Sequence, residues 1–280
     1  MFKFISLRSG SSGNCYYLFT ETDGLIIDSG IGLRTIKKTF REYGLRLDQI
    51  HNMVVTHDHS DHVKAAGAVS MAFGIPVYAT QLVHDGIKRN YCIKKKIPAS
   101  QQRIVTKGQT TQIGDFTVTP FDVPHDSMDN VCYKIEHGGV VFALITDAGH
   151  VTEEIARLIN AADYLVIEAN HEIEMLDAGP YPQHLKERIK SPTGHLSNDD
   201  CAKAIADNRS ERLKHIWLCH LSGENNTPER AAETVGSILA SRGVKLGEDF
   251  KMDVLSRRFP CGIFDLLPER DNVDTQTVTK

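Results

Sequence analysis

Four potential metal ligands occur within six residues of the sequence. His57, His59, Asp61 and His62 form the string HDHSDH, which follows the apolar run NMVV and Thr56. Imidazole nitrogens and carboxylate oxygens are ligands of zinc, and also of manganese and iron. Histidines two residues apart on an extended segment point the same way, whereas Asp61 and His62 begin a helix and face a second position. One strand-to-helix corner can thus serve two neighbouring metal ions, and coincidental histidines in a polar capping loop are the less favoured interpretation.

Further ligands are expected where other strands end. His125 follows the run FTVTPFDVP, Asp147 follows VVFALIT, and His220 follows IWLC. Taken singly, each has a structural explanation, as a loop histidine, a helix-capping aspartate or a core histidine. Taken together with the string at 57–62 they favour metal binding, because a pair of metal ions needs more ligands than one corner supplies.

Apolar strands must carry these residues to a common edge. The sequence predicts β-rich runs over 2–30, a helix over 33–43 ended by Gly44, a buried strand before His57, and a helix over 62–73 ended by Gly74. The middle of the chain is β-rich again, and the last third alternates helices and strands. Two β-rich blocks with helices predict two packed sheets with helices outside, in one domain over 1–267. The polar residues 268–280 are expected to form a disordered tail.

Composition and charge narrow the classes of function. The 280 residues, 41% hydrophobic and 24% charged, are ordinary for a soluble globular protein. The net charge of −4 gives no general attraction to nucleic acid or lipid, so a polyanion would need a local basic patch. No apolar run is long enough to cross a bilayer, and no signal-peptide core is evident. Six cysteines without a CxxC pair predict reduced, mostly buried thiols and hence a cytoplasmic location without membrane association.

The order of the candidate ligands resembles the metallo-β-lactamase superfamily. In addition, the segments SGSSGN, TDAG, EANH, YPQHLKERI, GHLSN and HLSGENN are similar to the YycJ-type (WalJ) subfamily of bacterial metallohydrolases. The resemblance implies an α/β (α+β) fold, a four-layer αββα sandwich of two mixed sheets, and two divalent ions, either zinc or manganese, with iron as a further option. It also implies how the ligands divide: His57, His59 and His125 hold the first metal, Asp61, His62 and His220 the second, and Asp147 bridges both.

Such a centre predicts a dinuclear metal-dependent hydrolase. Two divalent ions about 3.5–4 Å apart can share a hydroxide, lower its pKa towards about 7 and clamp the attacked group. The expected nucleophile is therefore a metal-bridging hydroxide, which Asp61 can also orient. The superfamily cleaves lactams, lactones, thioesters and phosphodiesters, so the fold and the metals do not select among these substrates.

The tripeptide HLS occurs twice, and the two copies differ in context. His220 ends an apolar run, whereas His195 follows a Pro/Gly loop. Together with Glu168 in EAN, this pattern resembles the phosphodiesterase branch typified by transfer-RNA 3′-processing endonucleases, which implies a Glu168–His195 pair beside the metals. A departing alkoxide must be protonated, and an imidazole oriented by a carboxylate is a suitable donor, so we expect His195 to act as general acid. The alternative is structural, with His195 merely preceding a helix cap at Ser197 and Asn198.

Two basic segments bear on the size of the substrate. Lys88–Lys96 and Lys186–Lys190 could follow a phosphate backbone, although a solvated helix face explains the first equally well. Only 72 residues separate Asp147 from His220, and no long Gly/Pro-rich arm is present, which weakens the case for transfer RNA. The resemblance implies an exonuclease-like phosphodiesterase acting on DNA. A small-molecule hydrolase of thioesters, lactones or cyclic phosphodiesters, and a metal-binding regulatory or scaffold protein, are the alternatives.

Several other polar residues have more than one interpretation. The turn Ser9–Asn14 either presents N–H groups to a phosphate or only joins two strands. Asn225 and Asn226, which follow His220, either contact the substrate or cap the next helix. Asp126, beside His125, could support that histidine. His171 and His184, before GHLSN, are expected at the surface rather than in a pocket.

Overall fold

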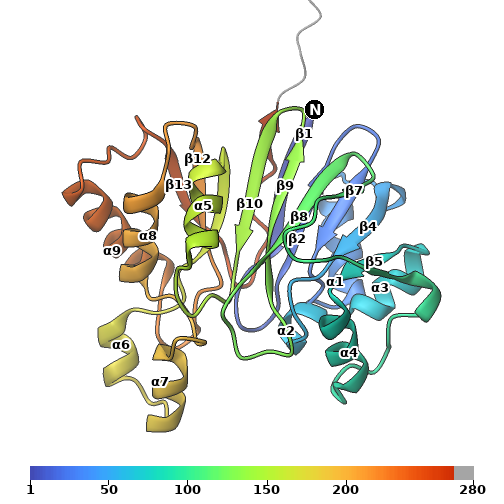
Figure 1. Ribbon diagram of the computed structural model, residues 1–280, viewed down its shortest axis with the longest axis horizontal. Coiled ribbons are helices and arrows are strands. Elements are labelled where there is room, and N and C mark those ends of the chain that lie inside the picture. The colour runs from blue at the N-terminus through green and yellow to red at the C-terminus, as the bar shows by residue number, and fades with distance from the viewer. Residues whose placement is uncertain (268–280) are drawn as a thin grey trace, which may run out of the picture.

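Two seven-stranded mixed β-sheets pack face to face in the computed structural model, which describes residues 1–267 (Figure 1). The first sheet has the order β14-β1-β2-β3-β4-β5-β6 and the second β13-β12-β11-β10-β9-β8-β7. The first comprises β1 (Phe2–Arg8), β2 (Cys15–Phe19), β3 (Gly24–Ile27), β4 (Ile50–Val54), β5 (Val77–Ala79), β6 (Gln102–Ile104) and β14 (Phe264–Leu267). The second comprises β7 (Thr111–Ile113), β8 (Phe116–Asp122), β9 (Val131–His137), β10 (Val140–Ile145), β11 (Tyr164–Glu168), β12 (His215–Cys219) and β13 (Lys251–Val254). The predicted tail over 268–280 lies outside the described residues.

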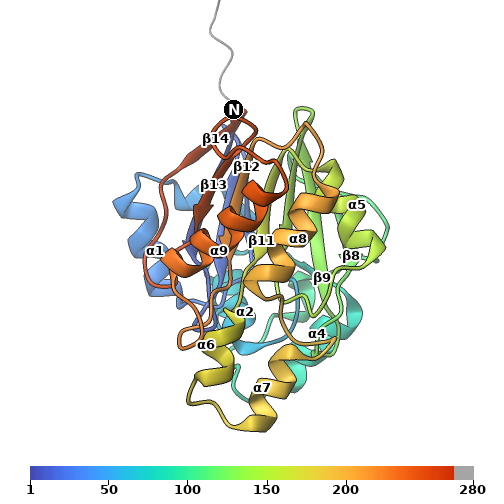
Figure 2. The same ribbon diagram turned by 90° about the vertical axis from the view of Figure 1, so that its left-hand side faces the viewer.

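Helices cover the outer faces of both sheets (Figures 1 and 2). The first sheet is covered by α1 (Leu33–Glu42), α3 (Ala66–Phe73) and α4 (Gln81–Arg89), and the second by α5 (Glu153–Ala161), α8 (Asn198–Asn208) and α9 (Pro228–Ser241). The short helices α2 (Ser60–Val63), α6 (Ile173–Ala178) and α7 (Gln183–Lys190) lie near one end of the sandwich, and 3₁₀ turns cover Leu47–Gln49 and Ala99–Gln101. Within 1–267, no helix has both the length and the apolar character that a membrane crossing requires. The predicted four-layer αββα fold is confirmed.

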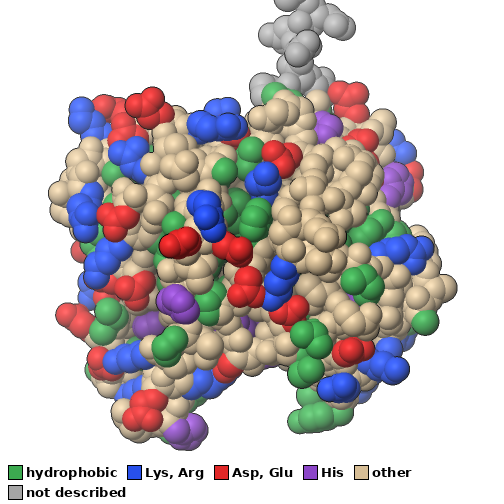
Figure 3. All heavy atoms as spheres, in the orientation of Figure 1, with side chains coloured by type: hydrophobic (Ala, Val, Ile, Leu, Met, Phe, Trp, Pro, Cys, Tyr) green, Lys and Arg blue, Asp and Glu red, His purple; other side chains and the backbone are tan. Residues whose placement is uncertain are grey.

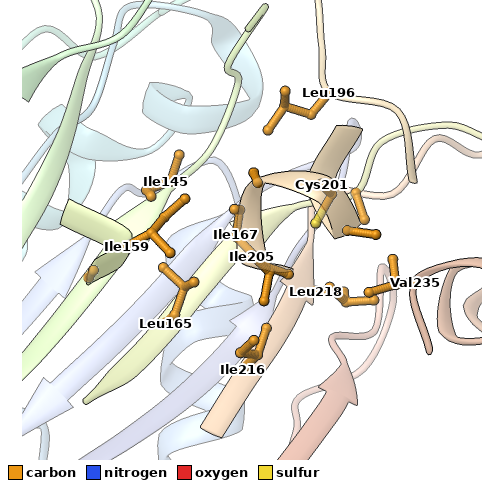
Figure 4. Close-up of a cluster of buried hydrophobic side chains, with 14 of the residues drawn as sticks. Ile145, Ile159, Leu165, Ile167, Leu196, Cys201, Ile205, Ile216, Leu218 and Val235 are labelled. Atoms are coloured by element: carbon orange, nitrogen blue, oxygen red, sulfur yellow. The ribbon is translucent and has the colours of Figure 1, made fainter. Parts of the chain in front are cut away.

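Alternate residues of each inner strand face different layers of the core. In β12, Trp217 belongs to the apolar cluster between the two sheets, where its ring centroid lies 4.8 Å from that of Phe4. Its neighbours Ile216 and Leu218 face the other way and pack with Ile205 of α8, as Figure 4 shows. Because both faces of such a strand are buried, it appears in the sequence as a continuous apolar run.

Parallel strands bring the candidate site residues to one edge. Strands β3 to β6 pair in parallel in the first sheet, and β10 to β13 pair in parallel in the second. The two sheets are joined at their carboxyl-terminal ends, since the backbone N–H of Val131 donates to the carbonyl of Thr56 at 3.1 Å and His57 forms a bridge with Asn130. Loops after β4, β10, β11 and β12 therefore meet at this edge, which is where ligands bind in layered α/β proteins.

Two helix predictions differ from the structure. The helix predicted over 62–73 is broken into α2 and α3, because the backbone N–H of Ala65 donates to the carbonyl of Ser29 at 2.8 Å instead of continuing the helix. Its predicted end is confirmed, since Gly74 adopts a left-handed φ of 68°. No helix was predicted between EANH and GHLSN, but this segment contains α6 and α7, which are too short to show a strong periodicity in the sequence.

The cysteines are free thiols, as predicted. Cys15, Cys132, Cys201 and Cys219 are buried and Cys261 is partly buried, whereas Cys92 is exposed. Burial raises the pKa of Cys132 to about 12, so this thiol stays protonated and packs as an apolar group.

Candidate metal centre

Three residues with left-handed backbone turn the chain at the ends of parallel strands. Asp28, Asp147 and His220 have φ values of 58°, 54° and 53°, and they are the non-glycine residues of the described chain with positive φ. Each such residue costs about 1–3 kcal/mol and persists only where the surrounding structure fixes it. The strained backbone therefore indicates that the direction of these three side chains is maintained at the cost of an unfavourable backbone conformation.

The structure brings all seven predicted ligands together. Ligand atoms of His57, His59 and His125 lie within 4.8 Å of one another. Asp147 lies between the predicted sets, with Oδ2 3.1 Å from Nε2 of His62 and Oδ1 3.7 Å from Nε2 of His125. The same spacing holds for the second predicted set, Asp61, His62 and His220.

Hydrogen bonds on the outer nitrogens orient the imidazoles. Nδ1 of His62 donates to Oδ2 of Asp28 at 2.7 Å, and Nδ1 of His125 donates to the carbonyl of Gly194 at 3.1 Å. The hydroxyl of Thr56 donates its hydrogen to the same carboxylate of Asp28 at 2.9 Å. Because that hydrogen is used, the hydroxyl oxygen of Thr56 accepts from Nδ1 of His57 at 3.0 Å. Since Nδ1 carries the hydrogen in each ring, the Nε2 lone pairs are left for the centre of the cluster, as in histidine metal sites.

A buried nitrogen without a partner supports the metal interpretation. Nε2 of His57 is fully buried and makes no hydrogen bond with any described residue. Leaving a buried acceptor unsatisfied costs free energy, and a divalent cation bound to this lone pair removes that cost. The nitrogen and oxygen donors gathered here fit zinc, manganese or iron.

The electrostatics of the cluster favour bound cations. Burial opposes the charged form of His62, but the carboxylates of Asp147, Asp28 and Asp61 outweigh it and hold the pKa of His62 well above its usual value. Burial likewise opposes the charged form of Asp147, yet neighbouring imidazoles, His220 foremost, hold its pKa well below the ordinary range. Metal ions supply the positive charge that protons otherwise provide, so metal binding releases protons.

Glu168 joins His195 to the cluster. Its Oε1 accepts from Nδ1 of His195 at 2.8 Å, which is the hydrogen bond expected from the sequence. The same oxygen accepts from Nδ1 of His220 at 3.0 Å, while Oε2 accepts the backbone N–H groups of Ala148 and Leu196. Burial opposes ionisation, but the two imidazoles and these hydrogen bonds lower the pKa of Glu168 to about 2. The sharing of Glu168 between both HLS histidines was not predicted.

His195 has a raised basicity and a defined orientation. Burial disfavours its charged form, but the Glu168 carboxylate and its hydrogen bond raise the pKa of His195 above the usual value. Ligand-type atoms of Asp147, Glu168, His195 and His220 also lie within 4.8 Å of one another, so geometry alone leaves both a proton-donor role and a ligand role for His195.

Sequence reasoning missed two residues that hold the cluster. Asp28 is fully buried and orients His62 and, through Thr56, His57. It follows the apolar run GLII as Asp147 and His220 follow theirs, so the strand-end rule applied to β3 would have found it. Asn14, from the Gly/Ser turn, places Nδ2 2.9 Å from Nε2 of His62.

The Gly/Ser turn is closed by its own hydrogen bonds. The N–H of Gly10 donates to Oδ1 of Asn14 at 2.8 Å, and the N–H of Gly13 donates to the carbonyl of Gly10 at 2.9 Å. This agrees with the tight-turn interpretation. The turn also touches the centre from outside, since the N–H of His220 donates to Oγ of Ser9 at 2.9 Å.

The structure also places the polar residues for which the sequence allowed more than one interpretation. Asn225 and Asn226 are buried, and the amide of Asn226 donates to the carbonyl of Ala169 at 2.9 Å, so these two asparagines support the fold. His184 is exposed as expected, but the surface prediction for His171 is wrong. His171 is buried, and its backbone carbonyl accepts the N–H of Asn198, which ties this segment to the start of α8. The remaining residue, Asp126, pairs with Arg188 at 2.8 Å and lies 3.5 Å from Nε2 of His125.

A groove opens beside the cluster. Its volume is 510 Å³, and it is lined by His59 and Asp61 together with Arg89, Tyr91 and Arg188. In Figure 3 the lower edge of the molecule is indented between the lobe of α6 and α7 and the lobe of α4. Two predicted ligands, His59 and Asp61, are therefore accessible from a groove whose lining also carries two arginines and a tyrosine.

Comparison with known proteins identifies the family. The model of the β-lactamase superfamily domain matches residues 25–216. The chain belongs to the metallo-β-lactamase superfamily. It is 35% identical over 260 residues to exodeoxyribonuclease YycJ of Bacillus anthracis, covering 93% of this chain and 97% of that protein. It is 36% identical over 251 residues to exodeoxyribonuclease WalJ of Streptococcus pneumoniae, covering 90% and 93%. The predicted resemblance and the hydrolase class are confirmed.

Solved structures of the superfamily share the fold at low sequence identity. Zn²⁺-bound PqqB from Methylobacterium extorquens superposes with a TM-score of 0.70 at 18% identity and covers 94% of this chain and 100% of that one. The short form of human tRNase Z superposes with a TM-score of 0.63 at 15% identity and covers 95% and 100%. At this identity the likeness extends to the fold alone.

Proposed function

We propose that this protein is a dinuclear metal-dependent phosphodiesterase that degrades DNA as an exonuclease. The observation that carries the proposal is the 2.8 Å hydrogen bond between Glu168 and His195 at the border of the ligand cluster. The alkoxide that leaves a DNA phosphodiester is a strong base and must be protonated as it departs. The thiolate that leaves a thioester is a weaker base and departs more readily without protonation. An imidazole held beside the centre therefore favours a phosphodiester over a thioester. The naming of two similar proteins as exodeoxyribonucleases supports the same substrate.

The residues divide into holding and proton-donating groups. His57, His59 and His125 would hold one divalent ion, and the set of Asp61, His62 and His220 the other, with Asp147 shared. When bound, the ions would supply an activated water and neutralise charge on the phosphate. Glu168 fixes Nδ1 of His195, so a proton on Nε2 is the one available to the leaving oxygen.

The identity of the ions and the location of the protein belong to this proposal. We infer zinc or manganese, because imidazole and carboxylate donors suit both. Free thiols and a DNA substrate favour a cytoplasmic location.

The proposal is tested by substrate class. Purified protein loaded with Mn²⁺ or Zn²⁺ is incubated with end-labelled DNA, bis-p-nitrophenyl phosphate and a glutathione thioester. We expect metal-dependent release of nucleotides from DNA and no comparable thioesterase turnover. The Asp147→Ala variant, which lacks the shared ligand, should lose both metal and activity. Robust thioester hydrolysis without phosphodiester cleavage would favour the small-molecule hydrolase instead, and DNA cleavage by metal-free Asp147→Ala protein would refute the mechanism.

A further inference from the structure

We propose that the segment Lys88–Lys96 guides an unpaired DNA strand into the metal centre and that Tyr91 stacks on one of its bases. This inference rests on the proposed DNA-degrading function and adds a specificity-determining residue to it. The segment comprises the last two residues of α4 and the turn that follows this helix, and it lies next to the metal cluster. Two residues of the segment, Arg89 and Tyr91, line the same groove as the predicted ligands His59 and Asp61.

Tyr91 is unusually exposed for an aromatic residue. The residue is 93% exposed, and its ring makes no aromatic contact within the described chain. An exposed aromatic side chain beside unpaired cations is typical of proteins that bind single-stranded nucleic acid, because every base offers a face for stacking. A base inside a duplex is already stacked on both faces, so the ring can receive only an unpaired base or the last base of a strand.

The segment displays cations that have no carboxylate partner. Lys88, Arg89, Lys94 and Lys95 are exposed, and none forms an ion pair with a described residue. The lysine at position 96 instead anchors the segment, since its Nζ donates to the carbonyl of Ile87 at 2.8 Å. The backbone is also held, because Gly67 allows the carbonyl of Lys95 to approach within 2.2 Å of where a Cβ would lie.

The second basic segment offers a contrast that the sequence did not reveal. Within Lys186–Lys190, Arg188 is paired with Asp126, and Lys190 is paired with Asp177. Lys186 donates to the backbone carbonyl of Asp177 at 2.7 Å. Cations that are already paired gain little by meeting a phosphate, so the segment at 88–96 is the one that suits a polyanion.

The stacking role is tested with DNA that lacks bases. Initial rates are measured for a single-stranded oligonucleotide and for a matched strand of tetrahydrofuran abasic units, with wild-type, Tyr91→Phe and Tyr91→Ala proteins. We expect wild-type and Tyr91→Phe to prefer the natural strand in kcat/KM by about ten-fold, since stacking on an aromatic residue contributes about that factor per base. Tyr91→Ala should lose this preference while it remains folded and metal-loaded.

The charge role is tested by salt dependence. Replacing two exposed lysines in Lys94→Ala/Lys95→Ala should lower the slope of log KM against log salt by about 1.4, since each contact to a single strand contributes about 0.7. The control Lys186→Ala/Lys190→Ala carries the same change of charge and should leave the slope unchanged.

The outcomes separate this inference from the proposed function. If wild-type protein cleaves no DNA, the proposed function is wrong. If wild-type protein cleaves DNA but Tyr91→Ala retains the preference for natural strands, only the stacking role is refuted. Equal changes of slope in both lysine pairs would refute the guiding role of the segment at 88–96.

Discussion

Replacement of His195 by alanine isolates the proton-donor step. The ring lies at the border of the cluster, 14% exposed, with Nδ1 fixed by Glu168. A positioned general acid contributes about 10²–10⁴ in rate, which corresponds to about 3–5 kcal/mol of activation free energy. We therefore expect kcat on DNA to fall by about that factor. The fold should persist, because Glu168 keeps its hydrogen bonds to His220, Ala148 and Leu196.

The leaving group tells a proton donor from a structural residue. In bis-p-nitrophenyl phosphate the departing p-nitrophenolate is a weak base, so its departure depends much less on protonation. We expect His195→Ala to lose far more activity on DNA than on this substrate, and His195→Gln to behave similarly. Metal content is measured in the same samples by mass spectrometry, and the melting temperature controls for folding.

Two results would refute this role for His195. A loss of bound metal in His195→Ala would make it a ligand, as the alternative set with Asp147, Glu168 and His220 allows. Equal losses on both substrates with full metal content would show that His195 positions the substrate or the ligands instead of donating a proton.

Two further predictions concern Asp28 and His84. Asp28→Asn removes the charge that orients His62 and Thr56, so we expect metal affinity, measured by chelator competition, to fall about 10- to 100-fold; unchanged affinity would leave Asp28 without the role assigned to it. Burial lowers the pKa of His84, whose Nε2 donates to the carbonyl of Arg103 and whose Nδ1 is buried without a described partner. Because the unfolded chain then binds the proton more readily, the free energy of unfolding should fall as pH decreases below about 6.5. In urea titrations across that pH range, His84→Gln should reduce the dependence on pH, and an identical dependence in both proteins would contradict this reasoning.

Much of the centre was predictable from local sequence, because parallel strands buried on both faces appear as apolar runs whose ends share one edge. His57, Asp147 and His220 each follow such a run, so residue type and position predicted the ligand cluster. The same rule applied to β3 would have revealed Asp28. The paired helices α2 and α3 were not separable in sequence, because the break depends on a hydrogen bond to Ser29 from another part of the chain.

Tertiary structure alone decided which polar groups have an ion-pair or hydrogen-bond partner within the protein. The sequence supplied two basic segments of similar appearance, but Arg188 meets Asp126 across 62 residues, whereas Arg89 meets no described carboxylate. In the same way, residue types suggested a partner for His195, while only the fold showed that Glu168 also binds His220. Charge and ligand type are properties of single residues and can be identified in the sequence. Whether a charge is paired, a carboxylate shared or a lone pair left unsatisfied depends on contacts between distant segments, which only folding creates.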